Sequence, residues 1–202
     1  MAQDLILPTC YLPNLSYFNQ LSNADAVALE KYEHFPKQTF RTRTQIATAN
    51  GILELIIPII HGKKDRVPMK DVRINYDEPW QRLHWMSIQT AYRRSAYFEF
   101  YEDDFRPFYE QKETFLFDFH LKQLQVLLKM LKLEKEIHFT DSFEEIADAS
   151  LDRRKIIHPK KPSLISHPVP YYQVFEEKNG FIPNLSIIDL LFNQGPQAKA
   201  YL

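Results

Sequence analysis

The first part of the chain alternates short apolar runs with one helical pattern. Residues 5–7 form an apolar run that a proline ends, as in a short buried strand, and Leu15, Phe18 and Leu21 then recur at helical spacing. Residues 26–30 form a second apolar run. This order predicts a strand–loop–helix–strand unit with a Rossmann-like layout. In such units a ligand binds where the first strand leads into the helix, so residues 9–17 are the expected wall of a site.

The next segment is polar and then strongly apolar. Residues 30–50 carry several cations among aromatics and predict a loop with a short helix, ended by the turn signal Asn50-Gly51. Residues 52–60 form a nearly continuous apolar run rich in isoleucine, which predicts a central strand. Apolar positions further on indicate a return strand that pairs antiparallel with it. The expected result is one mixed sheet of residues 5–7, 26–30, 52–60 and 69–74.

The second half is patterned for helices. Asp77-Glu78-Pro79 is typical of a helix start, and large residues then recur at three- and four-residue steps from Trp80 to Tyr92. Residues 98–133 predict one or two further helices with a break at Pro107, and residues 134–140 allow a short strand. Four prolines and a basic run make residues 153–170 a long surface loop.

The C-terminal segment predicts one more helix. Ser186 and Asp189 have capping-box spacing, so the helix covers residues 187–192, with Asp189 as a cap and an apolar stripe docked on the sheet. Asn184 and Asn193 flank it and are candidates to line a polar pocket. The tetrapeptide Pro-Asn-Leu-Ser occurs at both 13–16 and 183–186. The fold class is therefore α/β: a single domain over residues 1–202, with a mixed sheet, a Rossmann-like N-terminal unit and a mostly helical second half.

Composition narrows the function classes. The 202 residues suffice for one domain with a substantial core, and 14% aromatic residues indicate that large side chains are packed somewhere. Lys+Arg 25 against Asp+Glu 26 leaves a net charge of -1, which argues against a nucleic-acid partner. A single Cys and the lack of a signal peptide do not support secretion, and no apolar run is long enough for a membrane-spanning segment. We expect a cytoplasmic protein.

Candidate catalytic residues lie near the expected site wall. His84 is an acid/base candidate, because its one-turn spacing from Trp80 puts both on one helix face, but it fits a core histidine equally well. Tyr17 is the second catalytic candidate, and Thr9 and Tyr11 are candidate ligand-binding residues on the same stretch. Cys10 follows a strand end, where a nucleophile is placed well, although a lone Cys is more often inert packing.

A cationic group follows the second predicted strand. Lys37, Arg41 and Arg43 are candidates to clamp a carboxylate or phosphate, and His61, beside a basic turn, is a further candidate. A solvated basic face is the alternative interpretation. If the cations do bind a ligand, the partner is an anionic small molecule or a sugar nucleotide.

Metal and cofactor motifs are absent from the sequence. The seven His are scattered, without His-x-x-x-His or Cys-x-x-Cys, and no metal site is expected. Phosphate-binding glycine loops and Gly-x-Ser-x-Gly are also missing, so the sequence names no cofactor. The opening unit has the layout of His-x-Gly-His nucleotidylyltransferases, but Ser16-Tyr17 stands where that Gly-His pair would be.

Several segments together resemble the WbqC-like protein family. In that family a strand runs into a Pro-x-x-Gly-Tyr-Phe segment and a helix; here Ser16 replaces the glycine, and Pro8-Thr9 replaces a Gln-Pro. The resemblance spans essentially the whole chain, and its most specific block is at residues 180–196. The matching residues are Pro13, Tyr17-Phe18, Leu21, Lys37, Phe40, Arg43, Pro58, Trp80, His84, Ala91-Tyr92, Tyr97-Phe98 and Tyr172-Gln-Val-Phe175.

The resemblance implies a biological pathway, surface-polysaccharide biosynthesis, more clearly than it implies a particular reaction. Members of this family resemble products of gene clusters for O-antigen and other surface polysaccharides, with a proposed aminoacyl (glycine) transfer. We therefore expect a transferase-like protein of polysaccharide biosynthesis that transfers an aminoacyl or other activated group to a sugar. The competing hypothesis is a non-catalytic binding or scaffold protein that recruits glycan-assembly enzymes through an aromatic surface.

Overall fold

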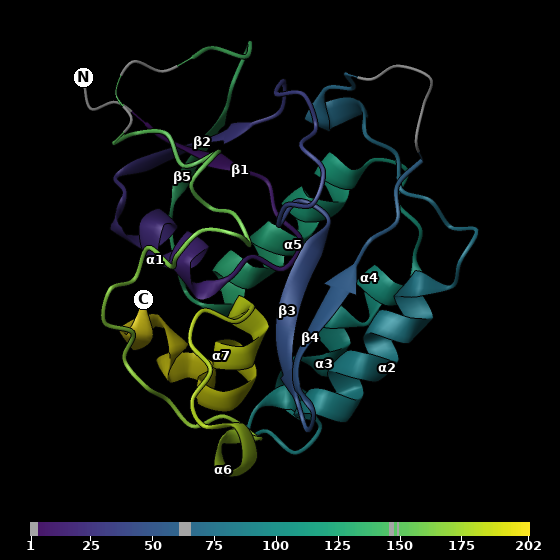
Figure 1. Cartoon of the computed structure of the whole chain (residues 1–202), viewed down its shortest axis with the longest axis vertical. Coiled ribbons are helices and arrows are strands. Elements are labelled where there is room, and N and C mark those ends of the chain that lie inside the picture. Colours follow the sequence, from purple (N-terminus) through teal and green to yellow (C-terminus); the bar gives the residue numbers. More distant parts are fainter. Residues whose placement is uncertain (1–3, 61–65, 146–147, 149) are drawn as a thin grey trace.

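A computed structural model describes residues 4–60, 66–145, 148 and 150–202 (Figure 1). Three parallel strands form the first sheet, in the order β1 (Leu5–Pro8), β2 (Ala26–Glu30), β5 (Glu136–Phe139). Leu5 of β1 pairs with Val27 of β2, and Ile137 of β5 pairs with the other side of Val27. The buried strand β2 is therefore the centre of this sheet, and the short strand predicted at residues 134–140 is its third member.

Helix α1 (Leu15–Asn23) connects β1 to the parallel strand β2. Its apolar residues Leu15, Phe18 and Leu21 are buried, as their helical spacing predicts. Asn14 is the N-cap, and its side-chain oxygen accepts a hydrogen bond from the Tyr17 backbone N–H. The predicted strand–loop–helix–strand unit is confirmed.

The segment after β2 differs from the prediction. Strands β3 (Arg43–Thr48) and β4 (Gly51–Ile56) form an antiparallel hairpin around Asn50-Gly51, where a loop and short helix were expected before a central strand at residues 52–60. Gly51 adopts a φ of 96°, which a turn of this kind needs. The hairpin forms a separate two-stranded sheet, and Ile52 and Ile56 of β4 are exposed. The predicted single mixed sheet is wrong, because turn chemistry at Asn50-Gly51 pairs two neighbouring strands locally.

The predicted return strand at residues 69–74 is also wrong. A short 3₁₀ helix η1 (Met69–Asp71) occupies its first half, after Pro68. Pairing with the preceding segment is reduced to one antiparallel bridge between Ile59 and Ile74. Proline lacks the backbone N–H that a strand here would use, which favours the compact turn.

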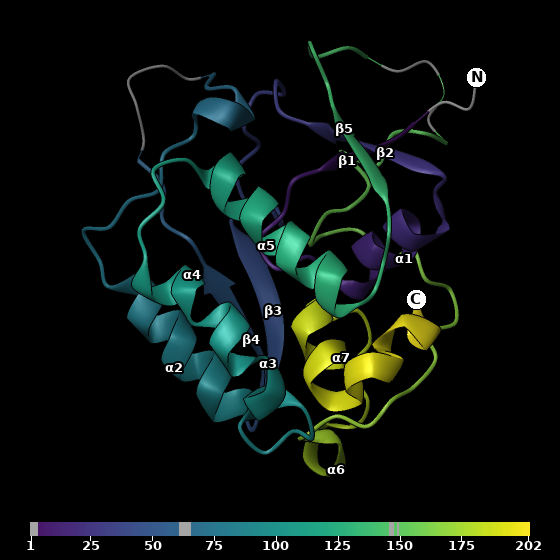
Figure 2. The same ribbon diagram turned by 180° about the vertical axis from the view of Figure 1, so that it is seen from behind.

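The helical second half matches the sequence pattern. Helix α2 (Trp80–Tyr92) is followed by α3 (Phe98–Phe105), α4 (Pro107–Glu110) and α5 (Leu116–Met130). Pro107 occupies the first turn of α4, so it starts a helix there as well as breaking the previous one. Helix α5 runs through the middle of the molecule, with the parallel sheet and α1 on one side and α2 to α4 on the other (Figures 1 and 2).

The C-terminal segment completes the core. After α6 (Glu176–Asn179), helix α7 (Ile187–Gln194) is buried along its length and is followed by η2 (Gly195–Tyr201). Its partners are α1 and α3 rather than the predicted strands, and Phe192 makes edge-to-face contacts with Phe98 and Phe105. Within the described residues, no helix has the length and apolar character to cross a membrane.

The predicted capping role of Asp189 is wrong. The Asp189 carboxylate is fully buried, where it accepts hydrogen bonds from the Tyr171 hydroxyl at 2.7 Å and the Gln173 amide at 2.9 Å. Ser186 occupies the N-cap position of α7, but its hydroxyl donates to the Leu12 carbonyl at 2.9 Å. Both side chains thus serve tertiary contacts, which a local spacing rule does not reveal.

Candidate functional site

The two Pro-Asn-Leu-Ser segments lie side by side and join the starts of α1 and α7. The Leu15 N–H donates to the Leu185 carbonyl at 3.0 Å, and the Ile187 N–H donates to the Pro13 carbonyl at 2.8 Å. Asn14 and Ser186 accordingly form an antiparallel bridge. The sequence repeat is therefore a pairing device that brings the N-terminal unit and the C-terminal block to one place.

Both asparagines of these segments cap α1. The Asn14 side-chain oxygen accepts from the Tyr17 N–H at 3.0 Å, and the Asn184 side-chain oxygen accepts from the Ser16 N–H at 2.8 Å. Because the two oxygens face backbone donors, the two side-chain NH₂ groups must point away from them. Within the described part of the chain neither NH₂ group has a hydrogen-bond partner. Two side-chain donors are thus left available at the start of α1.

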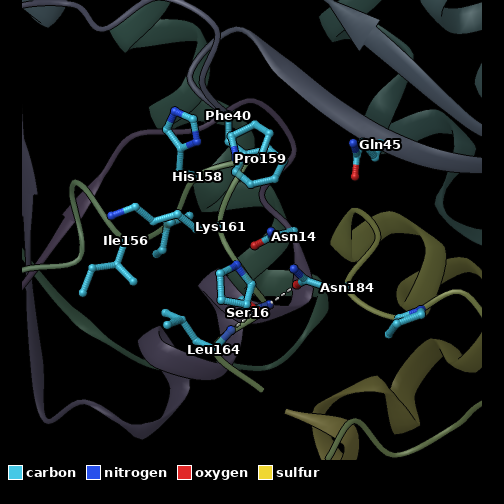
Figure 3. A pocket seen from close by; sticks show the side chains of 13 residues that line it. Asn14, Ser16, Phe40, Gln45, Ile156, His158, Pro159, Lys161, Leu164 and Asn184 are labelled. Carbon is cyan, nitrogen blue, oxygen red and sulfur yellow. Dashed lines mark hydrogen bonds between the residues drawn. The ribbon is translucent and has the colours of Figure 1, made fainter. Parts of the chain in front are cut away.

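A pocket of about 90 Å³ opens at this point (Figure 3). Its walls come from the start of α1, from β3 and from the loop at residues 156–164, as well as from the second Pro-Asn-Leu-Ser segment. No Asp or Glu is among the described residues that line it. The lining residues are Asn14, Ser16, Phe40, Gln45, Ile156, Ile157, His158, Pro159, Lys161, Pro162, Leu164, Pro183 and Asn184.

Ser16 ties the loop to the helix start. Its hydroxyl lies 2.8 Å from the Ser163 hydroxyl and accepts from the Leu164 N–H at 3.2 Å. These bonds place His158 and Lys161 on the wall of the pocket across from Asn184, as Figure 3 shows. The loop is thereby fixed to α1 and contributes Lys161, the cation among the described residues that line the pocket.

Cationic side chains lie in and around the pocket. Partial burial, then the charges of Lys160 and Lys161, and then those of Arg41 and Arg43 lower the pKa of His158. A pocket with amide donors and a lysine, and without a carboxylate among its described lining residues, suits a group that carries hydrogen-bond acceptors and negative charge.

The predicted cationic clamp is dispersed around this pocket and does not line it. Arg41 is buried and binds Glu33 through two contacts of 2.6 and 2.7 Å, whereas Arg43 pairs with Glu54 at 2.9 Å on the hairpin. Lys37 is exposed. His61 lies outside the described residues. Both arginines are therefore held by carboxylates, and direct ligand contact by any of the four stays a prediction.

Tyr11 and His84 are brought together in the core. The Tyr11 hydroxyl lies 3.0 Å from Nδ1 of His84 and 3.0 Å from the Tyr109 hydroxyl. Burial lowers the pKa of His84 to about 4, partly offset by a hydrogen bond to the Ile56 backbone. His84 is thus a neutral, paired histidine away from the pocket of Figure 3, and its catalytic role stays a prediction.

Thr9 and Tyr17 line a different, closed cavity together with Cys10 and His120. All four side chains are buried, and burial raises the pKa of the Cys10 thiol to about 12, so the thiol is protonated. The catalytic role of Tyr17 and the ligand-binding role of Thr9 stay predictions.

Sequence reasoning missed His158 and Lys161, because the loop at residues 153–170 has no periodicity and lies far from α1 in the sequence. The available signals were its run His158-Pro159-Lys160-Lys161 and the repeated Pro-Asn-Leu-Ser. Asn184 does line a pocket, as expected, whereas Asn193 is buried and donates to the Asp189 carbonyl. No cluster of three or more His, Cys, Asp or Glu suited to a metal ion occurs among the residues described.

The fold and pocket define an α/β protein with a polar, cationic cavity beside its N-terminal strand–helix unit. The chain belongs to the WbqC-like protein family, whose profile matches residues 9–161 and 163–201. The Uncharacterized protein Rv1507c of Mycobacterium tuberculosis (strain ATCC 25618 / H37Rv) is 22% identical over 228 residues, which cover 100% of this chain and 98% of that protein. No solved structure matches the chain.

Proposed function

We propose that this protein is a cytoplasmic, transferase-like protein of O-antigen or other surface-polysaccharide biosynthesis. It binds the anionic part of an activated donor, a sugar nucleotide or an aminoacyl (glycine) donor, in the pocket at the start of α1. The polysaccharide context comes from the resemblance to the WbqC-like family. The choice of an anionic ligand comes from the pocket itself.

The observation that carries the proposal is the one-sided chemistry of the pocket wall. The amide groups of Asn14 and Asn184 present donors, Lys161 presents a charge, and no carboxylate competes for them among the described lining residues. Phosphate and carboxylate groups are acceptors with negative charge, and charge-assisted hydrogen bonds to them are worth about 1.5–3 kcal/mol each. A neutral or cationic ligand gains none of this.

An isosteric change tests the donor argument. In Asn14→Asp the side-chain oxygen still caps α1, and a carboxylate is favourable at a helix N-terminus, so the protein should keep its stability. The outward NH₂ donor is replaced by a charged acceptor. We expect isothermal titration with pyrophosphate, UDP, UDP-N-acetylglucosamine and a sulfamoyl analogue of glycyl-adenylate to show at least one ligand for the wild type, with affinity lowered at least about tenfold in the variant.

A second pair of variants tests the cation. Lys161→Met should weaken the same ligand, whereas Lys155→Met, the same change on an exposed lysine outside the pocket wall, should not. If no anionic probe binds the wild type, or if both lysine variants bind it equally well, the proposed ligand class is wrong.

The alternative function is a non-catalytic scaffold, and one observation favours it. A groove of about 620 Å³ lies between the tip of the β3–β4 hairpin and α2, and its wall includes the exposed side chains of Leu83 and Met86. An exposed apolar groove of this kind suits a protein partner such as a glycan-assembly enzyme. Loss of partner binding in Met86→Asp, with ligand binding intact, would favour this alternative.

A further inference from the structure

A second cavity holds buried polar groups without partners. The Thr9 and Tyr17 hydroxyls have no hydrogen-bond partner in the described structure, and neither ring nitrogen of His120 forms a hydrogen bond of good geometry there, although the Arg41 backbone lies close to the ring. The three side chains are 2%, 1% and 2% exposed, so bulk water does not reach them. All three line one cavity between the end of β1, the start of α1 and α5.

Such groups are costly. A buried donor or acceptor without a partner costs about 1–3 kcal/mol, and folded proteins leave few of them. In this closed form the cavity has no space wide enough for a water molecule. Bound water therefore does not offset the cost in this closed form. A cluster of this kind at the carboxyl edge of a parallel sheet points to a ligand that supplies the partners.

The groups that face the cavity are uncharged. Burial raises the pKa of the Tyr17 hydroxyl and that of the Cys10 thiol. Burial and then the Arg41 charge lower the pKa of His120 to about 3, and the Arg41 backbone offsets part of this shift. The nearby Arg41 guanidinium is held by Glu33. The described residues that line the cavity therefore offer an anion no free cation. A hydroxyl group fits, because it donates one hydrogen bond and accepts others, as do Thr9, Tyr17 and a neutral imidazole.

The backbone is strained at Leu12, between Cys10 and Pro13, which both line the cavity. Leu12 has a φ of 38°, in the left-handed region that a branched residue rarely adopts. Its carbonyl is held by the hydroxyls of Thr44 and Ser186 at 2.8 and 2.9 Å. Strain of this kind persists only where surrounding contacts fix it, and it concentrates in segments that serve ligands.

We propose that this cavity is a second binding site, which opens to take the hydroxyl groups of a small uncharged polyol such as a free monosaccharide, with Thr9, Tyr17 and His120 as hydrogen-bond partners. It is separate from the anionic pocket, and its ligands carry no charge. Failure of one site therefore does not decide the other.

The first test compares two tyrosines in the unliganded protein. Tyr17→Phe and Thr9→Val each remove a hydroxyl without a partner, so the melting temperature should stay the same or rise. The matched control Tyr11→Phe removes a hydroxyl that is bonded to both His84 and Tyr109, so the melting temperature should fall. If Tyr17→Phe lowers the melting temperature as much as Tyr11→Phe does, Tyr17 is already paired in solution and the proposal fails.

The second test reads the ligand at His120. The ring nitrogen signals of ¹⁵N-labelled protein, assigned with His120→Gln, are followed during titration with glycerol, glucose, galactose and N-acetylglucosamine. At least one compound should shift the His120 signals saturably in the wild type and in Tyr11→Phe, and the shift should vanish in Tyr17→Phe. General stabilisation by excluded polyols does not produce this pattern, because it is not saturable at one residue. Unmoved His120 signals with every compound, or equal shifts in Tyr17→Phe, would overturn the proposal.

Discussion

Two buried polar regions lie near the carboxyl edge of the parallel sheet, and they differ in whether their groups are paired. In the paired cluster, Arg41 binds Glu33 and Arg154 binds Glu30, with shortest contacts of 2.6 Å in each case. In the unpaired cluster, Thr9, Tyr17 and His120 have no partners within the described structure. Both clusters are shielded from water.

The paired cluster shows that this fold can satisfy buried polar groups fully. One oxygen of the completely buried Glu30 accepts from the Tyr32 N–H, the Glu33 N–H and the Thr140 hydroxyl, and the other accepts from Arg154. Charged groups have the highest desolvation cost on burial, and in this cluster hydrogen bonds to each charged group offset that cost. We therefore interpret the unpaired cluster in the same region as the proposed second binding site, whereas the paired one holds the loops that follow β2.

The largest expected effect on stability comes from removing one partner of a buried ion pair in the paired cluster. Arg154→Met leaves Glu30 buried without its cation, and breaking a buried pair in this way costs about 3–5 kcal/mol. We expect the free energy of unfolding in urea to fall by that amount. As a control, Arg106→Met removes an exposed pairing with Glu102 and Asp103 and should cost less than about 1 kcal/mol. Equal losses in the two variants would show that the cluster does not anchor the fold.

The unpaired cluster is expected to make the stability of the protein depend on pH through His120. The pKa of His120 is lowered from 6.5 to about 3, so its contribution to stability is fully present above about pH 6.5 and is lost as the pH falls towards 3. When the pH is lowered from about 7 to about 5, the free energy of unfolding of His120→Leu should fall by about 2 kcal/mol less than that of the wild type. Urea unfolding at both pH values measures this difference.

Asp189 acts with the opposite sign and provides an internal control. Burial raises its pKa from 3.8 to about 6, so the protein gains stability from this group as the pH falls from 6 to 4. Asp189→Asn should therefore show a steeper loss of stability on acidification than the wild type.

If His120→Leu follows the wild-type pH profile, His120 titrates normally and is not buried as described.

The smallest effect is expected at the partly exposed pair on the hairpin. Glu54→Gln removes the partner of Arg43, whose side chain is 19% exposed. Such a pair contributes no more than about 1 kcal/mol, so the unfolding free energy should change little. A loss as large as that of Arg154→Met would mean that burial does not separate the two kinds of pair.

The sequence predicted the elements whose signals are local. The apolar spacing of α1, α2, α5 and α7 gave their positions, because each helix buries one stripe against the core. The hairpin was missed although Asn50-Gly51 is a strong hairpin signal, because the cations and aromatics before it masked the alternation of β3. Exposed Ile52 and Ile56 then made an edge strand resemble a buried one.

The candidate pocket depends on contacts that the sequence order hides. His158 and Lys161 reach α1 only because the Ser16 hydroxyl binds Ser163 and Leu164, and Asn184 reaches it through the paired Pro-Asn-Leu-Ser segments. Arg41 looked available for a ligand because its partner Glu33 gives no local signal of pairing. The chemistry of single residues was therefore visible, but their partners were not.

The most direct test of the proposed pocket is an amide NMR titration with UDP-N-acetylglucosamine. We expect saturable shifts of the Ser16 and Tyr17 backbone amides and of the Asn14 and Asn184 side-chain NH₂ groups, and in Lys161→Met the same shifts should reach saturation only at a higher ligand concentration. Shifts confined to the groove around Met86 and Phe175, or no shifts with this ligand or with pyrophosphate and the glycyl-adenylate analogue, would contradict it.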